Sequence, residues 1–155
     1  MFVFLPSTQA ATCSITTATV VNQTYVTNNS CTAIEINGNV STTWIGTVDL
    51  GGGTVTVKSG YTMTMGSSSA MVLGANDDFI VESNATTTHL RNDTYGVQIT
   101  ARNITISGKI NVDAKGCNGG GAAGVNGSGP HASTGICTVG ATGAGKTGGG
   151  GGGGG

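Results

Sequence analysis

Short runs of alternating apolar and polar residues follow one another along much of this chain. Between Val97 and Ala114 there are three such runs, with the apolar pairs Val97/Ile99, Ile104/Ile106 and Ile110/Val112. Alternation with a period of two is typical of a β-strand with one buried and one exposed face, and the few residues between the runs are too short for helices. Strands chained through tight corners predict a solenoid, in which each coil covers the apolar row of the coil before it.

Five earlier runs continue the pattern at intervals of about seven or eight residues, with glycine- and serine-rich turns between them. They are Thr47–Leu50, Thr54–Val57, Thr62–Met65, Met71–Leu73 and Phe79–Val81. No two-residue Asn-Gly or Asp-Gly loop of the kind that closes tight hairpins lies among these runs. We therefore predict an all-β fold in which residues 47–114 form the ladder of a right-handed parallel β-helix.

The remaining segments differ from the ladder in composition. Residues 12–46 are rich in Thr and Asn and predict a β segment of two strands, whereas residues 115–155 form a glycine-rich extension that ends in eight glycines. Residues 1–11 combine an apolar stub, Pro6 and small residues, which indicates either the end of a secretory signal or a strand at a contact between subunits. We expect the chain to be a fragment of a longer protein, truncated within the glycine tract.

A polar stretch from Glu82 to Tyr95 interrupts the ladder, and we expect it to loop out from one corner. It contains His89 and Asp93, which together suggest a metal site. Because no second histidine lies nearby, the sequence favours a plain surface loop and predicts no metal.

The composition supports β structure and excludes some classes of partner. Charged residues make up 8% of the chain, against about 25% in an ordinary soluble domain, while it has 25 Thr and 12 Ser. Threonine suits a pleated sheet, and no segment shows the pattern of an amphipathic helix. A net charge of -1 without a basic run argues against nucleic acid, and no apolar stretch reaches the roughly 18 residues of a membrane span.

Four cysteines lie in two pairs, one near each end of the chain. Cys13 and Cys31 are 18 residues apart, and Cys117 and Cys137 are 20 apart. Neither spacing is that of a Cys-x-x-Cys zinc site, so we predict the disulfides 13–31 and 117–137, although four cysteines allow three connectivities. Disulfides indicate an oxidising compartment and hence secretion.

The chain is unusually rich in acceptor sites for N-glycosylation. Seven of its 12 asparagines precede x-Ser or x-Thr, where chance would give about three. This excess favours a secreted glycoprotein whose sugars replace the missing charges. At Asn103 the ladder pattern directs Ile104 and Ile106 inward and therefore Asn103 outward. The seven predicted acceptors are Asn22, Asn28, Asn39, Asn84, Asn92, Asn103 and Asn126.

One motif suggests nucleotide binding. Residues 140–147 match the P-loop pattern GxxxxGK[ST] at every position. A working P-loop must continue as a helix, whereas here eight glycines follow, so we interpret the match as a product of glycine-rich composition.

Acidic and aromatic residues offer little support for catalysis. Asp77, Asp78, Arg91 and Arg102 could meet on neighbouring coils, as the charged groups of polysaccharide-cleaving β-helix enzymes do. The sequence favours a turn pair and solvated arginines instead, and it predicts no catalytic residue. Trp44 and Tyr61 could form a platform for a sugar, but packing in the core or at a corner is favoured.

The passage from Ile104 to Gly127 reads ITISGKINVDAKGCNGGGAAGVNG, in which a strand precedes a GKI-x-V-D-A-K-G turn and runs of glycine. It resembles the glycine-rich β-helix surface proteins of microbial eukaryotes, some of which build extracellular hairs such as the mastigonemes of flagella. The resemblance extends over roughly residues 97–155 and implies an architectural role without particular functional residues.

Together these patterns predict a secreted, cell-surface structural glycoprotein that forms or decorates an extracellular fibre and needs no cofactor. The alternative is a carbohydrate-binding or polysaccharide-cleaving β-helix protein. A solenoid whose two ends are both open would present unpaired backbone groups at each of them. Since the sequence shows no capping helix, we expect head-to-tail self-assembly into a homopolymer, or contact with other chains of a fibre.

Overall fold

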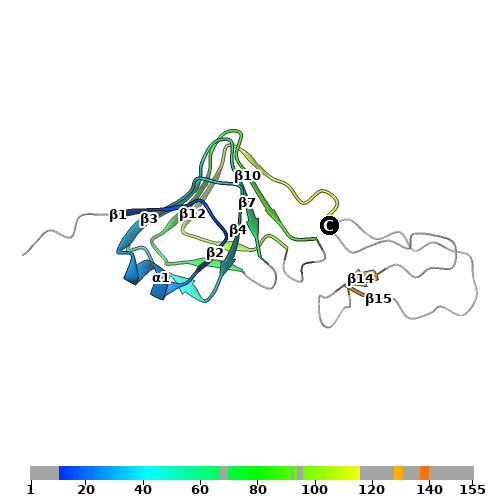
Figure 1. Ribbon diagram of the computed structural model, residues 1–155, viewed down its shortest axis with the longest axis horizontal. Helices are drawn as coiled ribbons and strands as arrows, with labels where there is room; N and C mark the ends of the chain where they lie inside the picture. The colour runs from blue at the N-terminus through cyan, green and yellow to red at the C-terminus, as the bar shows by residue number, and fades with distance from the viewer. Residues whose placement is uncertain are drawn as a thin grey trace, which may run out of the picture.

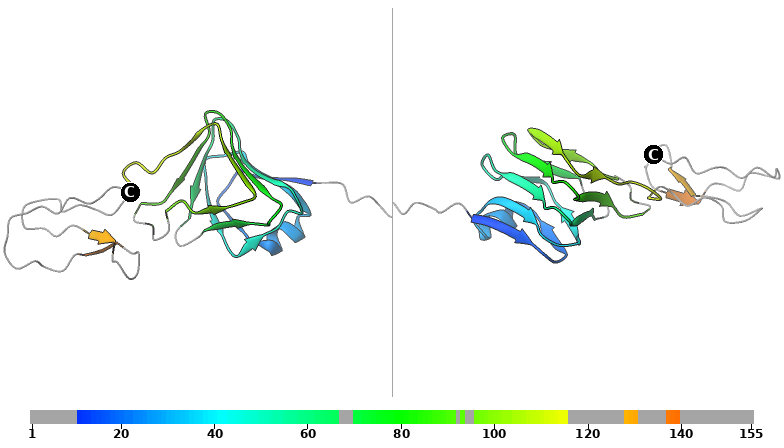
Figure 2. Two further views of the ribbon diagram at one scale, coloured as in Figure 1. Left: turned by 180° about the vertical axis from the view of Figure 1, so that it is seen from behind. Right: turned by 90° about the horizontal axis from the view of Figure 1, so that it is seen from above.

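The computed structural model of the protein describes residues 11–66, 70–91, 93 and 96–115, together with the backbone of two strands at 128–130 and 137–139. The described residues between 11 and 115 form a parallel β-solenoid of about four turns (Figures 1 and 2). Within the solenoid, consecutive strands along the chain belong to different sheets, and neighbouring strands within a sheet come from successive turns. The predicted all-β solenoid is confirmed.

Three parallel sheets form the walls of the solenoid. Sheet A, in the order of its pairing, contains β1 (Ala11–Ile15), β3 (Cys31–Ile36), β6 (Thr54–Val57), β9 (Asp78–Val81) and β12 (Asn103–Ile106). Sheet B contains β2 (Thr19–Val21), β4 (Val40–Trp44), β7 (Thr62–Met65), β10 (Thr86–His89) and β13 (Lys109–Ile110). Sheet C contains β5 (Thr47–Val48), β8 (Met71–Leu73) and β11 (Ile99–Thr100).

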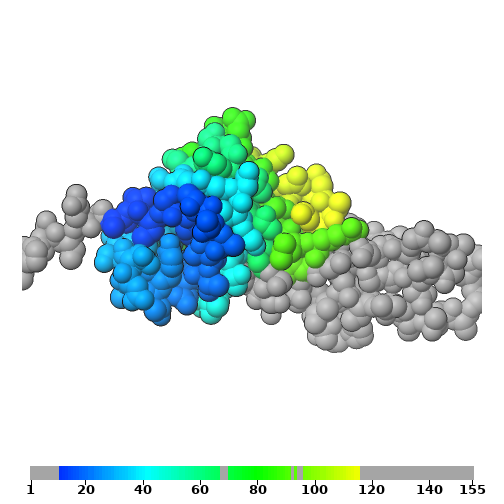
Figure 3. Space-filling model, viewed as in Figure 1, coloured from blue at the N-terminus to red at the C-terminus, as the bar shows by residue number. Residues whose placement is uncertain are grey.

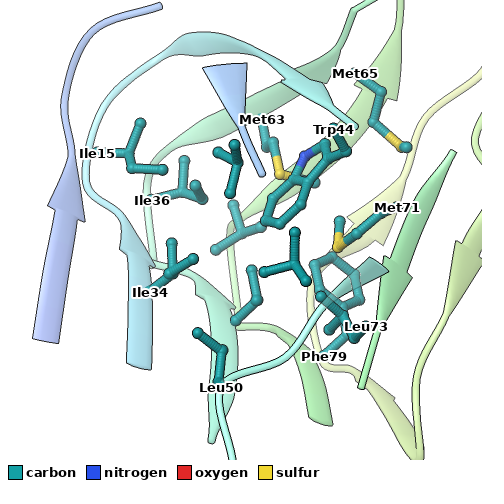
Figure 4. Packing of buried hydrophobic residues seen from close by; sticks show 14 of the residues in the cluster. Ile15, Ile34, Ile36, Trp44, Leu50, Met63, Met65, Met71, Leu73 and Phe79 are labelled. Atoms are coloured by element: carbon teal, nitrogen blue, oxygen red, sulfur yellow. The ribbon is translucent and has the colours of Figure 1, made fainter. Parts of the chain in front are cut away.

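The register of sheet A stacks apolar residues in columns that face the interior. Ile34 pairs with Val55, Val55 with Phe79, and Phe79 with Ile104. A second column runs Ile15, Ile36, Val57, Val81 and Ile106. Sheets B and C add Met63, Met65, Met71, Leu73 and Trp44 to the same core (Figure 4). The alternation read from the sequence therefore gives the correct inward face for these strands.

Glycine permits two features of the corners. Gly60, between β6 and β7, has a φ of 85°, which side chains of L residues rarely tolerate. Gly53 lies directly before β6, and a Cβ atom at this position would collide with the carbonyl oxygen of Thr32 on the preceding coil. Glycine at such corners allows successive coils to stack at the close spacing of paired strands.

The polar stretch 82–95 is not a simple surface loop, and this part of the prediction is wrong. Residues 86–89 form β10, which pairs with β7 on one side and with β13 on the other. Thr87 and His89 are buried in line with Met63 and Met65, and the Nδ1 atom of His89 lies 2.7 Å from the carbonyl oxygen of Leu90. The strand escaped prediction because Thr-Thr-Thr-His has no bulky aliphatic residue to mark its inward face.

A short helix, α1 (Gln23–Asn28), also contradicts the expectation that the chain has no amphipathic helix. Its Val26 is buried in the core, and Asn22 caps its N-terminus by accepting a hydrogen bond from the backbone N–H of Tyr25 at 2.8 Å. The Thr- and Asn-rich segment that contains it, 12–46, is continuous with the ladder, since β3 pairs with β6.

Beyond the solenoid, β14 (Ser128–Pro130) and β15 (Cys137–Val139) pair with each other in an antiparallel sheet. The apolar stub at 1–10, Cys117 and the terminal glycine tract lie outside the described residues, as do positions 140–147 of the P-loop-like motif.

Candidate functional site

The carboxylate of Asp77 lies at the corner where sheet C leads into sheet A. It is completely buried, and its Oδ1 atom accepts hydrogen bonds from the backbone N–H groups of Gly52 and Gly53 at 2.8 and 2.9 Å. Its Oδ2 atom accepts a third bond from the N–H of Leu50 at 2.7 Å. Asp77 thus binds the backbone of the preceding coil and is not directed toward a substrate.

Asp78, the next residue, faces outward and binds the following coil. It accepts hydrogen bonds from Nε and Nη2 of Arg102 at 2.9 and 2.8 Å, and from Nδ2 of Asn103 at 2.9 Å. The bond from Arg102 holds the pKa of Asp78 below its ordinary value and raises the pKa of Arg102. Arg91 is exposed in the turn after β10, so these four residues do not form a single cluster.

A second set of charges crosses the coils at the corner between sheets A and B. The Nζ atom of Lys58 lies between Glu82 and Glu35, with Glu35 at 3.7 Å. Glu82 also accepts a hydrogen bond from the backbone N–H of Ser59 at 2.9 Å. The hydrogen bond between Lys58 and Glu82 lowers the pKa of Glu82 and raises that of Lys58. These charges, like Asp77 and Asp78, connect successive coils.

Other candidate residues also have structural positions. Trp44 is buried in the core and donates a hydrogen bond from Nε1 to Oγ1 of Thr42 at 3.0 Å, whereas Tyr61 is partly exposed at a corner, as the sequence favours. Within the described part of the chain, no group of three His, Cys, Asp or Glu side chains could hold a metal ion. No helix in that part has the length and apolarity needed to cross a membrane.

Five of the seven predicted glycan acceptors lie in the solenoid. Asn28, Asn39 and Asn84 are exposed, and Asn84 sits in a turn with a φ of 62°. Asn39 uses its Oδ1 atom to accept a bond from the backbone N–H of Thr62 at 2.8 Å. Asn22 is half-buried at the helix cap, while Asn103 is exposed on β12 but donates to Asp78. Asn92 and Asn126 lie outside the described residues.

The predicted disulfide between Cys13 and Cys31 is confirmed. The two Cα atoms are 5.5 Å apart, and the bond joins β1 to β3, two neighbouring strands of sheet A. The second predicted pair, Cys117 with Cys137, includes a residue outside the described part of the chain.

A shallow groove lies beside the last two coils. It has a volume of about 380 Å³ and is lined by Asn84, Ala85, Thr86, Ser107, Gly108 and Lys109. Lys109 is the only charged residue of this lining. The groove therefore lacks the pair of acid and base groups that glycoside hydrolysis requires.

The two ends of the solenoid differ sharply, although the sequence predicts both to be open. In the first coil α1 contacts β2, β3 and β5, and the inward residues Ile15 and Val21 are 2% and 0% exposed. On the last strands, Ile104, Ile106 and Ile110 are 46%, 45% and 40% exposed. The right-hand view of Figure 2 shows the first coil, in blue, and the last strands, in yellow-green, at opposite ends of the stack of coils, and Figure 3 views the solenoid with the first coil in front.

The side chain of Gln23 explains how the helix joins the first coil to sheet C. Its Nε2 atom donates to the carbonyl oxygen of Asp49 at 3.1 Å, and its Oε1 atom accepts from the N–H of Asp49 at 2.7 Å. The Gln23 amide thus makes the pair of hydrogen bonds to the backbone after β5 that a neighbouring strand would otherwise make. The other end is formed by β11, β12 and β13, and no further described strand covers it. We call this end, with its exposed Ile104, Ile106 and Ile110, the open end.

Comparison with known proteins adds no family assignment: no protein-family model, curated protein or solved structure matches the chain.

Proposed function

We propose that the protein is a secreted structural glycoprotein that forms or decorates an extracellular fibre or cell-surface appendage. The observation that carries this proposal is the use of polar side chains to join successive coils. Asp77, Asp78 and Glu82 each bond to a neighbouring coil. A solenoid held together in this way is an extended scaffold with polar outer faces.

Two further features support an extracellular setting. The disulfide between Cys13 and Cys31 favours an oxidising compartment. The exposed acceptors Asn28, Asn39 and Asn84 could carry sugars without disturbing the apolar interior. Sugars on these faces would supply the solubility that a chain with 8% charged residues lacks.

Mass spectrometry of material from the native source, before and after glycosidase treatment, tests the proposal. We expect modification at Asn28, Asn39 and Asn84, and less at Asn103, whose Nδ2 atom is engaged by Asp78. Immunogold labelling of intact cells should place the protein on an extracellular fibre or appendage. Unmodified asparagines together with intracellular labelling would refute the proposal.

The groove beside Asn84 and Lys109 supports a second candidate, a carbohydrate-binding or polysaccharide-cleaving protein. Binding and turnover assays on a panel of neutral and uronic-acid polysaccharides separate the two. The structural proposal predicts no turnover, because the groove has no carboxylate in its lining. A saturable activity that is lost in Lys109→Ala would favour the second candidate.

A further inference from the structure

At the open end, the buried apolar columns of sheet A end in exposed residues. Ile104 follows Phe79 in register, and Ile106 follows Val81; both preceding residues are fully buried. β12 and β13 are also the last strands of sheets A and B, so their outer edges have no partner strand among the described residues. Exposed apolar side chains beside unpaired strand edges mark a surface at which another chain adds strands.

The chain itself does not supply that cover in its described part. Inward residues of sheet A recur at Ile34, Val55, Phe79 and Ile104, so the next strand is due roughly 25 residues after Ile104. Residues 128–130 do form a strand, β14, at this position in the sequence, but β14 pairs in antiparallel fashion with β15. Residues 116–127, which precede this strand in the sequence, contain only one bulky aliphatic residue, Val125.

The opposite end of a second copy is a poor match. It presents α1 where later coils have a strand of sheet C, and a helix is about 10 Å wide whereas strands are spaced by about 4.8 Å. The helix would hold β1 and β2 away from pairing distance on at least one side. Moreover, the inward residues Ile15 and Val21 of that end are already covered.

We propose that the open end is a self-docking surface, on which a second copy of the chain binds through its own open end. The contact is isologous, with a two-fold axis perpendicular to the solenoid. Strands β11, β12 and β13 carry one charged side chain, Lys109, so no cluster of like charges opposes the approach. The inference rests on the proposed function and deepens it: because an isologous contact closes a dimer, that dimer is the unit that decorates an appendage or joins a fibre through further contacts.

The pattern of β12 fixes the register of this contact. The two copies of β12 run antiparallel, and residues opposite each other must face the same side. Ile104 then lies opposite the partner's Ile106, which covers both isoleucines of each copy. Thr105 lies on the two-fold axis, opposite the partner's Thr105. The same axis brings β13 opposite the partner's β11, so Ile110 is covered as well.

Sedimentation of the full chain over a range of concentrations, after enzymatic removal of any glycans, tests the association. We expect a monomer–dimer equilibrium that Ile106→Asp weakens at least tenfold. Val20→Asp is the matched control, because Val20 is 51% exposed but lies on β2 at the other end. A wild-type monomer at every concentration, or equal effects of both variants, would overturn the proposal.

Cysteine cross-linking tests the orientation. Thr105→Cys alone should give dimers under mild oxidation, with a 105–105 link found by non-reducing peptide mapping. In a head-to-tail assembly Ser14, which stands in the same outward column as Thr105, would be its neighbour. Cross-linking only in the double variant S14C/T105C would establish head-to-tail stacking, and no cross-link in either would indicate cover by another segment; both results contradict the proposal. Neither result bears on whether the protein is a secreted glycoprotein, which the glycan and labelling experiments decide.

Discussion

The first and last coils are built from similar strands, yet only the first has its interior closed. Ile15 on β1 and Ile106 on β12 belong to one column of sheet A, but Ile15 is buried and Ile106 is nearly half exposed. The difference comes from what accompanies the strands. The first coil has a helix, a side-chain amide that bonds to the backbone of the next coil, and a disulfide, whereas nothing among the described residues covers the last coil in the same way. An apolar row thus specifies a solenoid coil without specifying how the solenoid ends.

The largest expected effect is the difference in stability lost when a buried and an exposed isoleucine of this column are each replaced by alanine. Ile36→Ala removes a completely buried side chain and should destabilise the protein by about 2–5 kcal/mol. Ile106→Ala removes one that is partly in water and should cost less than about 1 kcal/mol in the monomer. Urea unfolding monitored by circular dichroism at low protein concentration gives both values. Equal losses would mean that the open end is covered in solution.

Removing the disulfide should weaken the first coil by an intermediate amount. For a loop of this length, the double variant C13S/C31S should lose about 3 kcal/mol, because the unfolded chain is no longer constrained. The same unfolding assay measures the loss, with the reduced wild-type protein as control. Hydrogen exchange should increase mainly in β1 and β3, which the bond joins. An unchanged stability would show that α1 alone closes this end.

The sequence predicts most of the walls because their inward residues are large and apolar and alternate with polar or smaller ones. The predicted runs at 54–57, 62–65 and 71–73 coincide with β6, β7 and β8. The pattern does not reveal β10, because burial of Thr87 and His89 depends on the strands on either side of it, and only the tertiary structure brings those strands together. Burying polar residues in this strand costs stability at Thr87, because its buried Oγ1 atom has no hydrogen-bond partner among the described residues.

The helix and the corner contacts were beyond prediction for a different reason. α1 has only six residues, three of which are Thr or Val, so its helix propensity is weak and its cap, Asn22, reads equally well as a glycan acceptor. Asp77 and Asp78 are adjacent in sequence, but one carboxylate faces inward and the other outward. Which of them binds backbone and which binds Arg102 depends on the register of neighbouring coils, about 25 residues away in sequence.

Loss of the N-terminal cap of α1 should reduce the stability of the first coil by a smaller amount. Asn22→Ala removes the acceptor for the N–H of Tyr25 and should cost about 1 kcal/mol. Because this change also removes a glycan acceptor, the measurement is made on protein produced without glycans. Asn22→Asp keeps a capping oxygen, and Thr24→Ala destroys only the acceptor sequence; both should stay close to wild type. A loss of similar size in Thr24→Ala would indicate that the effect does not come from the cap.

The smallest effect expected is a loosening of the last coils in acid. The pKa values of Asp78 and Glu82 are lowered in the folded protein by Arg102 and Lys58, respectively. Each pair therefore stabilises the fold fully above the unfolded pKa values of about 3.9 and 4.3, and this contribution is lost as the pH falls through the lower folded values. Both carboxylates lie near solvent, so screening keeps the contribution small.

The ends should respond differently to this change in pH. Asp78 connects β9 to Asn103 at the start of β12, whereas the contacts of Gln23 with the Asp49 backbone and the Cys13–Cys31 bond do not titrate in acid. Amide exchange measured between pH 6 and pH 3, and corrected for the intrinsic rate, should therefore increase in β12 before it increases in β1. In Asp78→Asn, exchange in β12 should already be faster at pH 6 and should depend less on pH. If exchange instead increases in β1 and β12 together, and Asp78→Asn behaves like wild type, the Asp78–Arg102 pair does not hold the last strand in place. The order of the open end would then come from the partner that covers it.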